Sequence, residues 1–189
     1  KSAYSLQPPT YAAGMIFVDA GNYIQAFNAK TLESVWISEA LEEKIYTPIT
    51  YRNGYIYAGT WVNEAKNGHY VCISVTDEEP DKTDETKYCT WKNKQMGGFY
   101  FAGAYATDKY VIYGGDNGST AANANSSLVS VNSRTGEIID KITTIVGDAR
   151  SAIAYDNGFV YFTSKSGYIY KVGLNSDGSF REVVETNLG

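Results

Sequence analysis

Hydrophobic residues alternate with polar ones at every second position along much of the chain, and short polar turns interrupt the alternation. In residues 14–36, Ile16 and Val18 share one face, a turn follows at 20–22, and the alternation resumes at 23–27. A period of two is typical of half-buried β-strands, and turns this short join antiparallel neighbours. The stretch therefore predicts two antiparallel strands that lead into a third.

This pattern returns three more times. The copies begin at Thr10, Thr47, Ala102 and Ser151, and equivalent turn positions lie roughly 40 to 55 residues apart. That period is typical of β-propeller blades, whereas helical repeats would place apolar residues three and four positions apart. The predicted repeats are about 10–46, 47–101, 102–150 and 151–189.

Each repeat supplies four short strands, of which the first is rich in small residues and the second carries aromatic residues. Asn53-Gly54 and Asn157-Gly158 supply the positive φ angles that a two-residue hairpin turn needs. The predicted first strands are 48–51, 103–106 and 152–155, and the predicted second strands are 55–58, 110–113 and 159–162. The predicted third strands are 23–27, 70–75, 128–131 and 168–172. The predicted fourth strands are 33–37, 87–91, 138–143 and 180–184. The predicted fold class is all-β, a propeller of about four four-stranded antiparallel blades in a single domain or propeller segment.

The first repeat carries the most complete set of recurring residues, which are Gly14, Ile16, Phe17, Ile24, Ala26, Asn28, Thr31 and Trp36. This set resembles the PQQ-like repeat of quinoprotein-dehydrogenase-like propellers, although Leu32 stands where that family prefers glycine. The third repeat restores the dipeptide as Thr135-Gly136. The resemblance implies a ring that closes with seven or eight blades.

Four blades leave such a ring incomplete, and open sheet edges invite aggregation. The chain begins at Lys1 rather than methionine, and we expect it to be a segment of a longer propeller. Two alternatives stay open, a homodimer in which two copies complete a ring and a closed ring of four blades.

The charge and the residue types exclude several classes of function. A net charge of -5 and a pI near 4.9 argue against binding to nucleic acid. No apolar run approaches the ~20 residues of a membrane span. His69 is the sole histidine, so we expect neither a histidine metal site nor a Ser-His-Asp triad. The acidic stretch 76–86 lacks the residue order of a calcium loop and is expected to form a solvated hairpin tip.

Two cysteines lie at equal distances from the centre of that acidic stretch. If 70–75 and 87–91 pair as a hairpin, Cys72 and Cys89 lie opposite each other on one face. This spacing allows a cross-strand disulfide, which would indicate an oxidising compartment, or two free buried thiols.

The candidate site lies where connectors between blades and the loops after each second strand meet at one end of a propeller. Those segments also contain Phe99 and Asp148, and the predicted ligand-binding residues are Tyr46, Trp61, Tyr100, Asp116 and Arg150. Aromatic faces with a few hydrogen-bonding groups suit a carbohydrate or a peptide ligand. The alternative is that these aromatic rings only pack between blades and that Arg150 only pairs with Asp148.

We therefore expect a noncatalytic binding or scaffold module of a secreted or cell-surface protein, or of a periplasmic one, with no cofactor. The resemblance also implies alternatives, namely a quinone-type dehydrogenase relative, a glycan-cleaving propeller or an envelope assembly scaffold. A quinone site would need a tryptophan platform, and the three tryptophans, Trp36, Trp61 and Trp91, are spread along the sequence.

Overall fold

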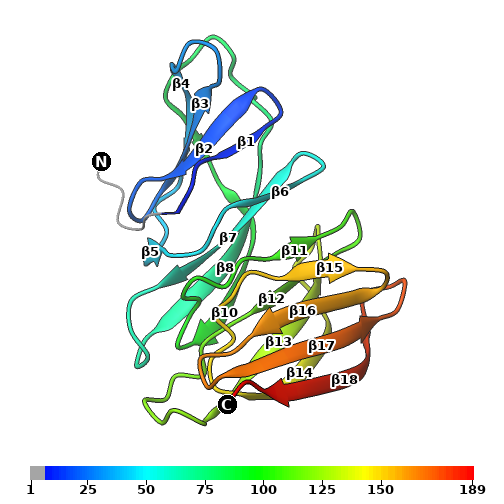
Figure 1. Ribbon diagram of the computed structural model, residues 1–189. Helices are drawn as coiled ribbons and strands as arrows, with labels where there is room; N and C mark the ends of the chain where they lie inside the picture. The colour runs from blue at the N-terminus through cyan, green and yellow to red at the C-terminus, as the bar shows by residue number, and fades with distance from the viewer. Residues whose placement is uncertain (1–6) are drawn as a thin grey trace.

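The computed structural model describes residues 7–189, so the start at Lys1 lies outside the described residues. Four β-sheets follow one another along an arc, and each is built mainly from antiparallel strands that are neighbours in sequence (Figure 1). The exception is β9, which joins the first sheet in parallel. The predicted all-β fold of four four-stranded blades is confirmed. No helix long and apolar enough to cross a membrane occurs in the described part of the chain.

The first two blades contain the strands up to residue 96. They are β1 (Thr10–Ala12), β2 (Met15–Asp19), β3 (Ile24–Asn28), β4 (Ser34–Ser38), β5 (Lys44–Ile45), β6 (Thr50–Arg52), β7 (Tyr55–Trp61), β8 (Asn67–Ser74), β9 (Glu85–Lys87) and β10 (Cys89–Met96). Blade 1 has the order β1-β2-β3-β4-β9. In blade 2, β7 pairs with β6, β5 and β8, and β10 forms the outer edge.

The last two blades have four strands each. They are β11 (Tyr105–Ala106), β12 (Tyr110–Gly114), β13 (Asn125–Asn132) and β14 (Ile138–Val146) in blade 3, and β15 (Ala154–Asp156), β16 (Phe159–Thr163), β17 (Tyr168–Leu174) and β18 (Phe180–Asn187) in blade 4. Both sheets run in sequence order.

The turns between first and second strands have the conformations that the sequence predicts. Asn53 and Gly54 have φ values of 44° and 83°, and Asn157 and Gly158 have 45° and 83°. These left-handed angles match the right-handed twist of the paired strands. The turns fix the register, which sets Tyr57 opposite Thr50.

Three apolar clusters lie between neighbouring blades and hold the arc together. Phe17, Trp36 and Ile56 belong to the cluster between blades 1 and 2. Tyr57, Tyr70, Trp91 and Tyr113 fill the next interface, where Tyr70 and Tyr113 stack with ring centres 4.0 Å apart. Val160, Phe162 and Tyr170 belong to the third cluster, between blades 3 and 4. Several tyrosines therefore pack between sheets, among them Tyr57, Tyr70, Tyr113 and Tyr170.

The structure corrects the predicted fourth strand of the second repeat. Residues 87–91 do not form one strand, because Glu85–Lys87 pairs in parallel with β4 of blade 1 while Cys89–Met96 forms the outer edge of blade 2. The predicted opposition of the two cysteines is also wrong. Cys89 lies opposite Ile73 and packs against the blade 1 side, whereas Cys72 faces blade 3. Both thiols are free, and burial raises the pKa of each to about 12.

The acidic stretch folds around one buried lysine instead of forming only a solvated tip. The Lys87 ammonium lies 3.2 Å from a carboxylate oxygen of Glu85 and 2.8 Å from the carbonyl oxygen of Thr76. Both charged side chains are 5 % exposed. A second Glu85 oxygen accepts hydrogen bonds from the backbone N–H groups of Glu78 and Glu79. This arrangement holds β9 against blade 1.

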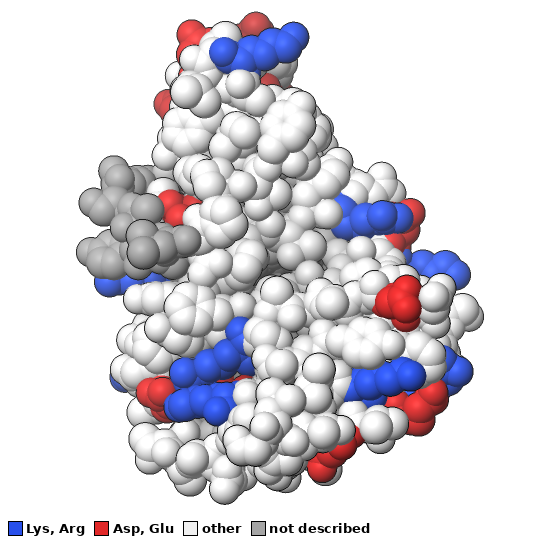
Figure 2. Space-filling model, viewed as in Figure 1, with Lys and Arg blue, Asp and Glu red and all other residues white. Residues whose placement is uncertain are grey.

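On the face shown in Figure 2, basic and acidic side chains form small separate groups between large uncharged areas. This face offers no continuous basic stripe of the kind that binds phosphate backbones.

Candidate functional site

The connectors between blades and the loops after each second strand are joined by backbone hydrogen bonds at one end of the molecule, here called the loop end. The N–H of Phe101 donates to the carbonyl of Tyr46, and the N–H of Asp116 donates to that of Gly98. The N–H of Lys165 donates to the carbonyl of Asp148. These bonds tie blades 2, 3 and 4 together at the expected position of the site.

All five predicted ligand-binding residues lie at the loop end. Tyr46 belongs to the connector before β6, Trp61 ends β7, and Tyr100 lies in the connector before β11. Asp116 follows β12, and Arg150 precedes β15. Five separate segments therefore meet, and their side chains form two adjoining groups.

The first group is the aromatic cluster, defined as Tyr46, Trp61, Tyr100 and Phe101. Trp61 and Tyr100 have ring centres 4.6 Å apart, and Tyr46 lies 5.3 Å from Trp61 and 5.4 Å from Tyr100. Tyr100 and Phe101 are 4.1 Å apart. The first three rings are partly buried, while Phe101 is 43 % exposed. The cluster thus keeps apolar area at the surface.

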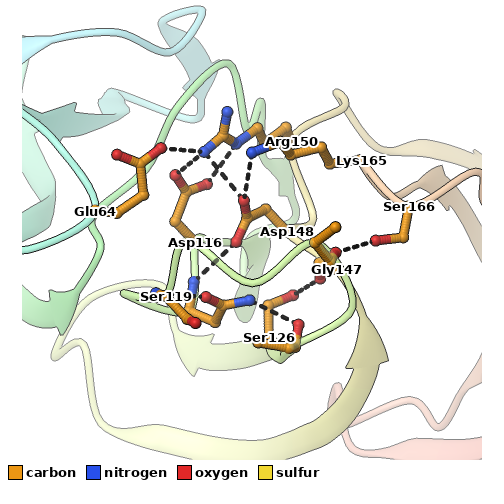
Figure 3. A network of polar contacts seen from close by, with 12 residues as sticks. Glu64, Asp116, Ser119, Ser126, Gly147, Asp148, Arg150, Lys165 and Ser166 are labelled. Atoms are coloured by element: carbon orange, nitrogen blue, oxygen red, sulfur yellow. Dashed lines mark hydrogen bonds and ion pairs between the residues drawn. The ribbon is translucent and has the colours of Figure 1, made fainter.

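The second group is the arginine cluster, defined as Arg150, Asp116, Asp148, Glu64 and Lys165 (Figure 3). Arg150 donates from Nε to one Asp116 oxygen at 2.9 Å and from Nη2 to the other at 2.5 Å. The same Nη2 lies 3.0 Å from Asp148 and 3.3 Å from Glu64. Lys165 Nζ is 3.8 Å from Asp148. Three carboxylates therefore share one guanidinium.

The three acids of the arginine cluster differ in how deeply they are buried. The Asp116 side chain is 0 % exposed and that of Asp148 is 4 % exposed, whereas that of Glu64 is 28 % exposed. Burial raises the pKa of Asp116 to about 6, and the charge of Asp148 adds to this effect while Arg150 opposes it. Hydrogen bonds, including one from Arg150, hold the pKa of Glu64 below its usual value. Asp116 is therefore placed beneath the surface, where it positions Arg150.

Arg150 connects the two groups. Its guanidinium carbon lies 4.9 Å from the centre of the Tyr100 ring, a distance typical of a cation–π contact. The indole N–H of Trp61 lies close enough to Asp116 to favour the carboxylate form. That nitrogen is buried and has no hydrogen-bond partner of good geometry in the described chain. It therefore faces the interior beside Asp116 and not the solvent.

Close backbone packing and one strained residue hold the site in place. A side chain at Gly98 would come within 2.8 Å of the carbonyl oxygen of Thr60, and one at Gly114 would come within 2.6 Å of the Ala149 side chain. Phe101 has a φ of 60°, which a bulky residue rarely adopts. The strain directs an exposed ring outward beside Tyr100.

Three residues of the site, Glu64, Lys165 and Phe101, were not predicted from the sequence. Their position in loops after second strands, or in a connector between blades, was the available signal. A contact between blades 1 and 2 was not predicted either, in which Glu43 Oε2 lies 3.0 Å from Nδ1 of His69.

The tryptophans do not fit the platform that a stacked quinone would need. Trp36 is 0 % exposed and Trp91 is 7 % exposed, because each packs between two blades. Trp61 has its ring against Tyr46 and Tyr100. The three indoles therefore lie at separate places, two of them enclosed between blades and Trp61 at the loop end.

No protein-family model and no curated protein sequence matches the chain. Solved structures do resemble it. BamB from Moraxella catarrhalis has a TM-score of 0.61 and 14 % identity over 92 % of this chain and 49 % of that chain. A quinohemoprotein alcohol dehydrogenase from Pseudomonas putida HK5 has a TM-score of 0.67 and 10 % identity over 98 % of this chain and 34 % of that chain.

A computationally designed protein, Ika8, has a TM-score of 0.67 and 9 % identity over 93 % of this chain and 48 % of that chain. The chain therefore spans a third to a half of the length of these three structures. The likeness to the BamB and dehydrogenase structures, together with the four blades, establishes the fold. The protein has the PQQ-like β-propeller fold and forms four consecutive blades of it.

Proposed function

We propose that the protein is a noncatalytic binding module whose loop end holds a peptide segment of a partner protein against the aromatic cluster. The observation that carries the proposal is the convergence of Tyr46, Trp61 and Tyr100 from three different segments, with ring centres 4.6 to 5.4 Å apart. Arg150 lies beside them. Tyr, Trp and Arg are the residue types that dominate binding energy at protein interfaces.

An exposed aromatic residue beside the cluster's three other rings supports a peptide ligand. Phe101 keeps 43 % of its surface exposed at a strained backbone position, and such strain is commonly retained at binding sites. Sugars also stack on aromatic rings, so a carbohydrate is the second candidate ligand.

The arginine cluster supports a binding role over hydrolysis. A glycan-cleaving site needs two carboxyl groups that reach the scissile bond. Asp116 and Asp148 are 0 % and 4 % exposed and both contact Arg150. Their position beneath the surface suits a structural support for Arg150 and the rings above it.

The ligand class is tested by presenting the purified chain in parallel to a random-peptide phage library and to a glycan array. We expect enriched peptides whose affinity falls by about 30-fold or more in Trp61→Ala, the loss of a typical hot-spot residue. Tyr88→Ala is the control, because Tyr88 is 71 % exposed beside β9. Glycan binding that Trp61→Ala abolishes would replace the peptide with a carbohydrate. Peptide binding that Trp61→Ala leaves unchanged would contradict the site.

We also propose that the outer faces of blades 1 and 4 pack against further blades. In a solution of the purified chain, a second copy supplies these blades. Tyr11 is 69 % exposed on blade 1, and Ile169 and Val184 are 40 % and 53 % exposed on blade 4. The register places all three on the faces opposite the inter-blade clusters. Light scattering should give about twice the chain mass of 20.8 kDa, and a compact monomer would contradict the two-copy ring.

The location outside the cytosol that the repeat class implies stays a prediction. It can be checked by fusing the full-length gene product to a reporter that is active on one side of the membrane only.

A further inference from the structure

A histidine and two glutamates meet between blades 1 and 2, apart from the aromatic and arginine clusters. The connector after β4 forms β5, which pairs with β7 so that Lys44 lies opposite Trp61 and Ile45 opposite Thr60. This pairing brings Glu42 and Glu43 against the start of β8, where His69 lies. His69 has the strand parity of Val71 and Ile73, which face blade 1.

Glu43 and His69 are held in a fixed geometry. Glu43 Oε2 lies 3.0 Å from His69 Nδ1 and accepts a hydrogen bond of 2.8 Å from the hydroxyl of Thr60. The same hydroxyl accepts a hydrogen bond of 2.9 Å from the backbone N–H of His69. The Glu43 and His69 side chains are 12 % and 11 % exposed. Thr60 thus orients both groups, as outer-shell residues orient metal ligands.

Glu42 completes the group from the solvent side. It is exposed, and one ligand atom from each of Glu42, Glu43 and His69 lies within 4.8 Å of the other two. Two atoms bound to one Zn²⁺ at ~2.0 to 2.2 Å in tetrahedral geometry lie roughly 3.3 to 3.6 Å apart. The Glu43 and His69 atoms are already near this separation, and the exposed Glu42 has room to adjust.

We propose that Glu42, Glu43 and His69 bind one Zn²⁺ ion with a water molecule in the fourth position. One imidazole nitrogen and two carboxylate oxygens are ligand types that zinc accepts, and three protein ligands plus water is a common coordination. Two carboxylates neutralise the charge of the ion. Lys94 lies opposite His69 in the register with β10, but it is exposed and can turn toward solvent.

Bound zinc would link the connector from blade 1 to β8 of blade 2. Because the ion binds the folded arrangement, it should raise the unfolding temperature in proportion to the logarithm of the zinc concentration. Binding should release protons or weaken at low pH, since the imidazole and carboxylates must be deprotonated.

The test is isothermal titration of the chelator-treated chain with zinc chloride. We expect one ion per chain and an affinity at least tenfold weaker in Glu42→Gln and in His69→Gln. Glu182→Gln is the matched control, because Glu182 is a half-exposed glutamate on β18, and it should bind as the wild type does. Glu42→Gln changes only an exposed side chain, so its unfolding temperature without metal should stay unchanged while the increase caused by zinc is reduced.

Cobalt substitution identifies the ligands independently. Co²⁺ bound by nitrogen and oxygen should show weak visible bands that His69→Gln alters. A strong thiolate-to-cobalt band would place the metal at a cysteine and overturn the proposal. It would also be overturned if zinc failed to saturate one site below about 1 mM, or if the three variants bound with equal affinity.

Discussion

The buried carboxyl group of Asp116 gives a quantitative test of the arginine cluster, through the substitution Asp116→Asn. The variant removes one partner of Arg150, yet Arg150 keeps Asp148 at 3.0 Å and Glu64 at 3.3 Å. Asparagine has nearly the shape of a protonated aspartic acid. The comparison therefore measures what ionisation of Asp116 costs the folded protein.

The magnitude follows from the pKa of Asp116, which burial raises from 3.8 to about 6 in the folded protein. An acid whose folded pKa lies above its unfolded pKa binds its proton more tightly in the folded state. Its contribution to stability is complete below about pH 4 and is lost as the pH rises through 6. A shift of about two units corresponds to about 3 kcal/mol. The unfolding free energy of Asp116→Asn minus that of wild type should therefore rise by about 3 kcal/mol from pH 3 to pH 7.

The assay is urea unfolding of both proteins at intervals from pH 3 to pH 8, with the difference in unfolding free energy plotted against pH. At pH 7 the relative gain corresponds to roughly 6 to 12 °C in unfolding temperature. Asp108→Asn is the matched control, because hydrogen bonding to the exposed Arg52 lowers the pKa of Asp108. Its difference from wild type should change with pH in the opposite direction.

The reasoning would be refuted by a difference between Asp116→Asn and wild type that does not change with pH. It would also be refuted by a variant that loses stability, relative to wild type, as the pH rises from 4 to 6. The first result would mean that the guanidinium of Arg150 fully offsets the burial of the Asp116 carboxylate, and the second that it outweighs that burial.

Three further predictions concern the blades. Lys87→Met should lower the unfolding free energy in urea by about 3 to 5 kcal/mol, because Glu85 would keep a buried charge without its partner; a loss below 1 kcal/mol would contradict the role of Lys87 in holding β9. Gly68→Ala should lower the free energy by about 1 to 3 kcal/mol in thermal unfolding, since a Cβ there would collide with the carbonyl oxygen of Thr60, and an unchanged unfolding temperature would contradict that contact. Iodoacetamide at pH 8 should leave Cys72 and Cys89 largely unmodified in the folded chain, because both have pKa values of about 12. After unfolding it should modify both. Rapid labelling of the folded chain would show that burial does not protect them.

The strands were predictable from the sequence because their signals are local. The Asn53-Gly54 and Asn157-Gly158 turns fix hairpin registers by backbone conformation alone. The pairing of Lys87 with Ser38 was not predictable in this way. It joins residues far apart in sequence. The charged residues around Lys87 have the composition of a solvated loop, and only the fold shows that Lys87 and Glu85 are buried together.

The candidate site was predictable in position but not in its internal arrangement. Propeller connectivity brings the connectors and second-strand loops together, which is why Trp61, Tyr100 and Arg150 were expected at one end. Whether Asp116 faces solvent or supports Arg150 from beneath depends on how three loops pack. The packing of these loops cannot be predicted from residues that are neighbours in sequence. His69 shows the same limit, because Glu43 reaches it through the pairing of β5 with β7.

The parallel strand β9 has a consequence for the order of folding during synthesis. Blade 1 is complete only when Glu85–Lys87 reaches β4, and that segment follows β6, β7 and β8 of blade 2 along the chain. Until then the outer edge of the first sheet has unpaired backbone groups, which attract other strands. The growing chain must therefore leave this edge open for about fifty residues after β4 is made, and a holding chaperone or rapid docking of blade 2 would protect it during that interval.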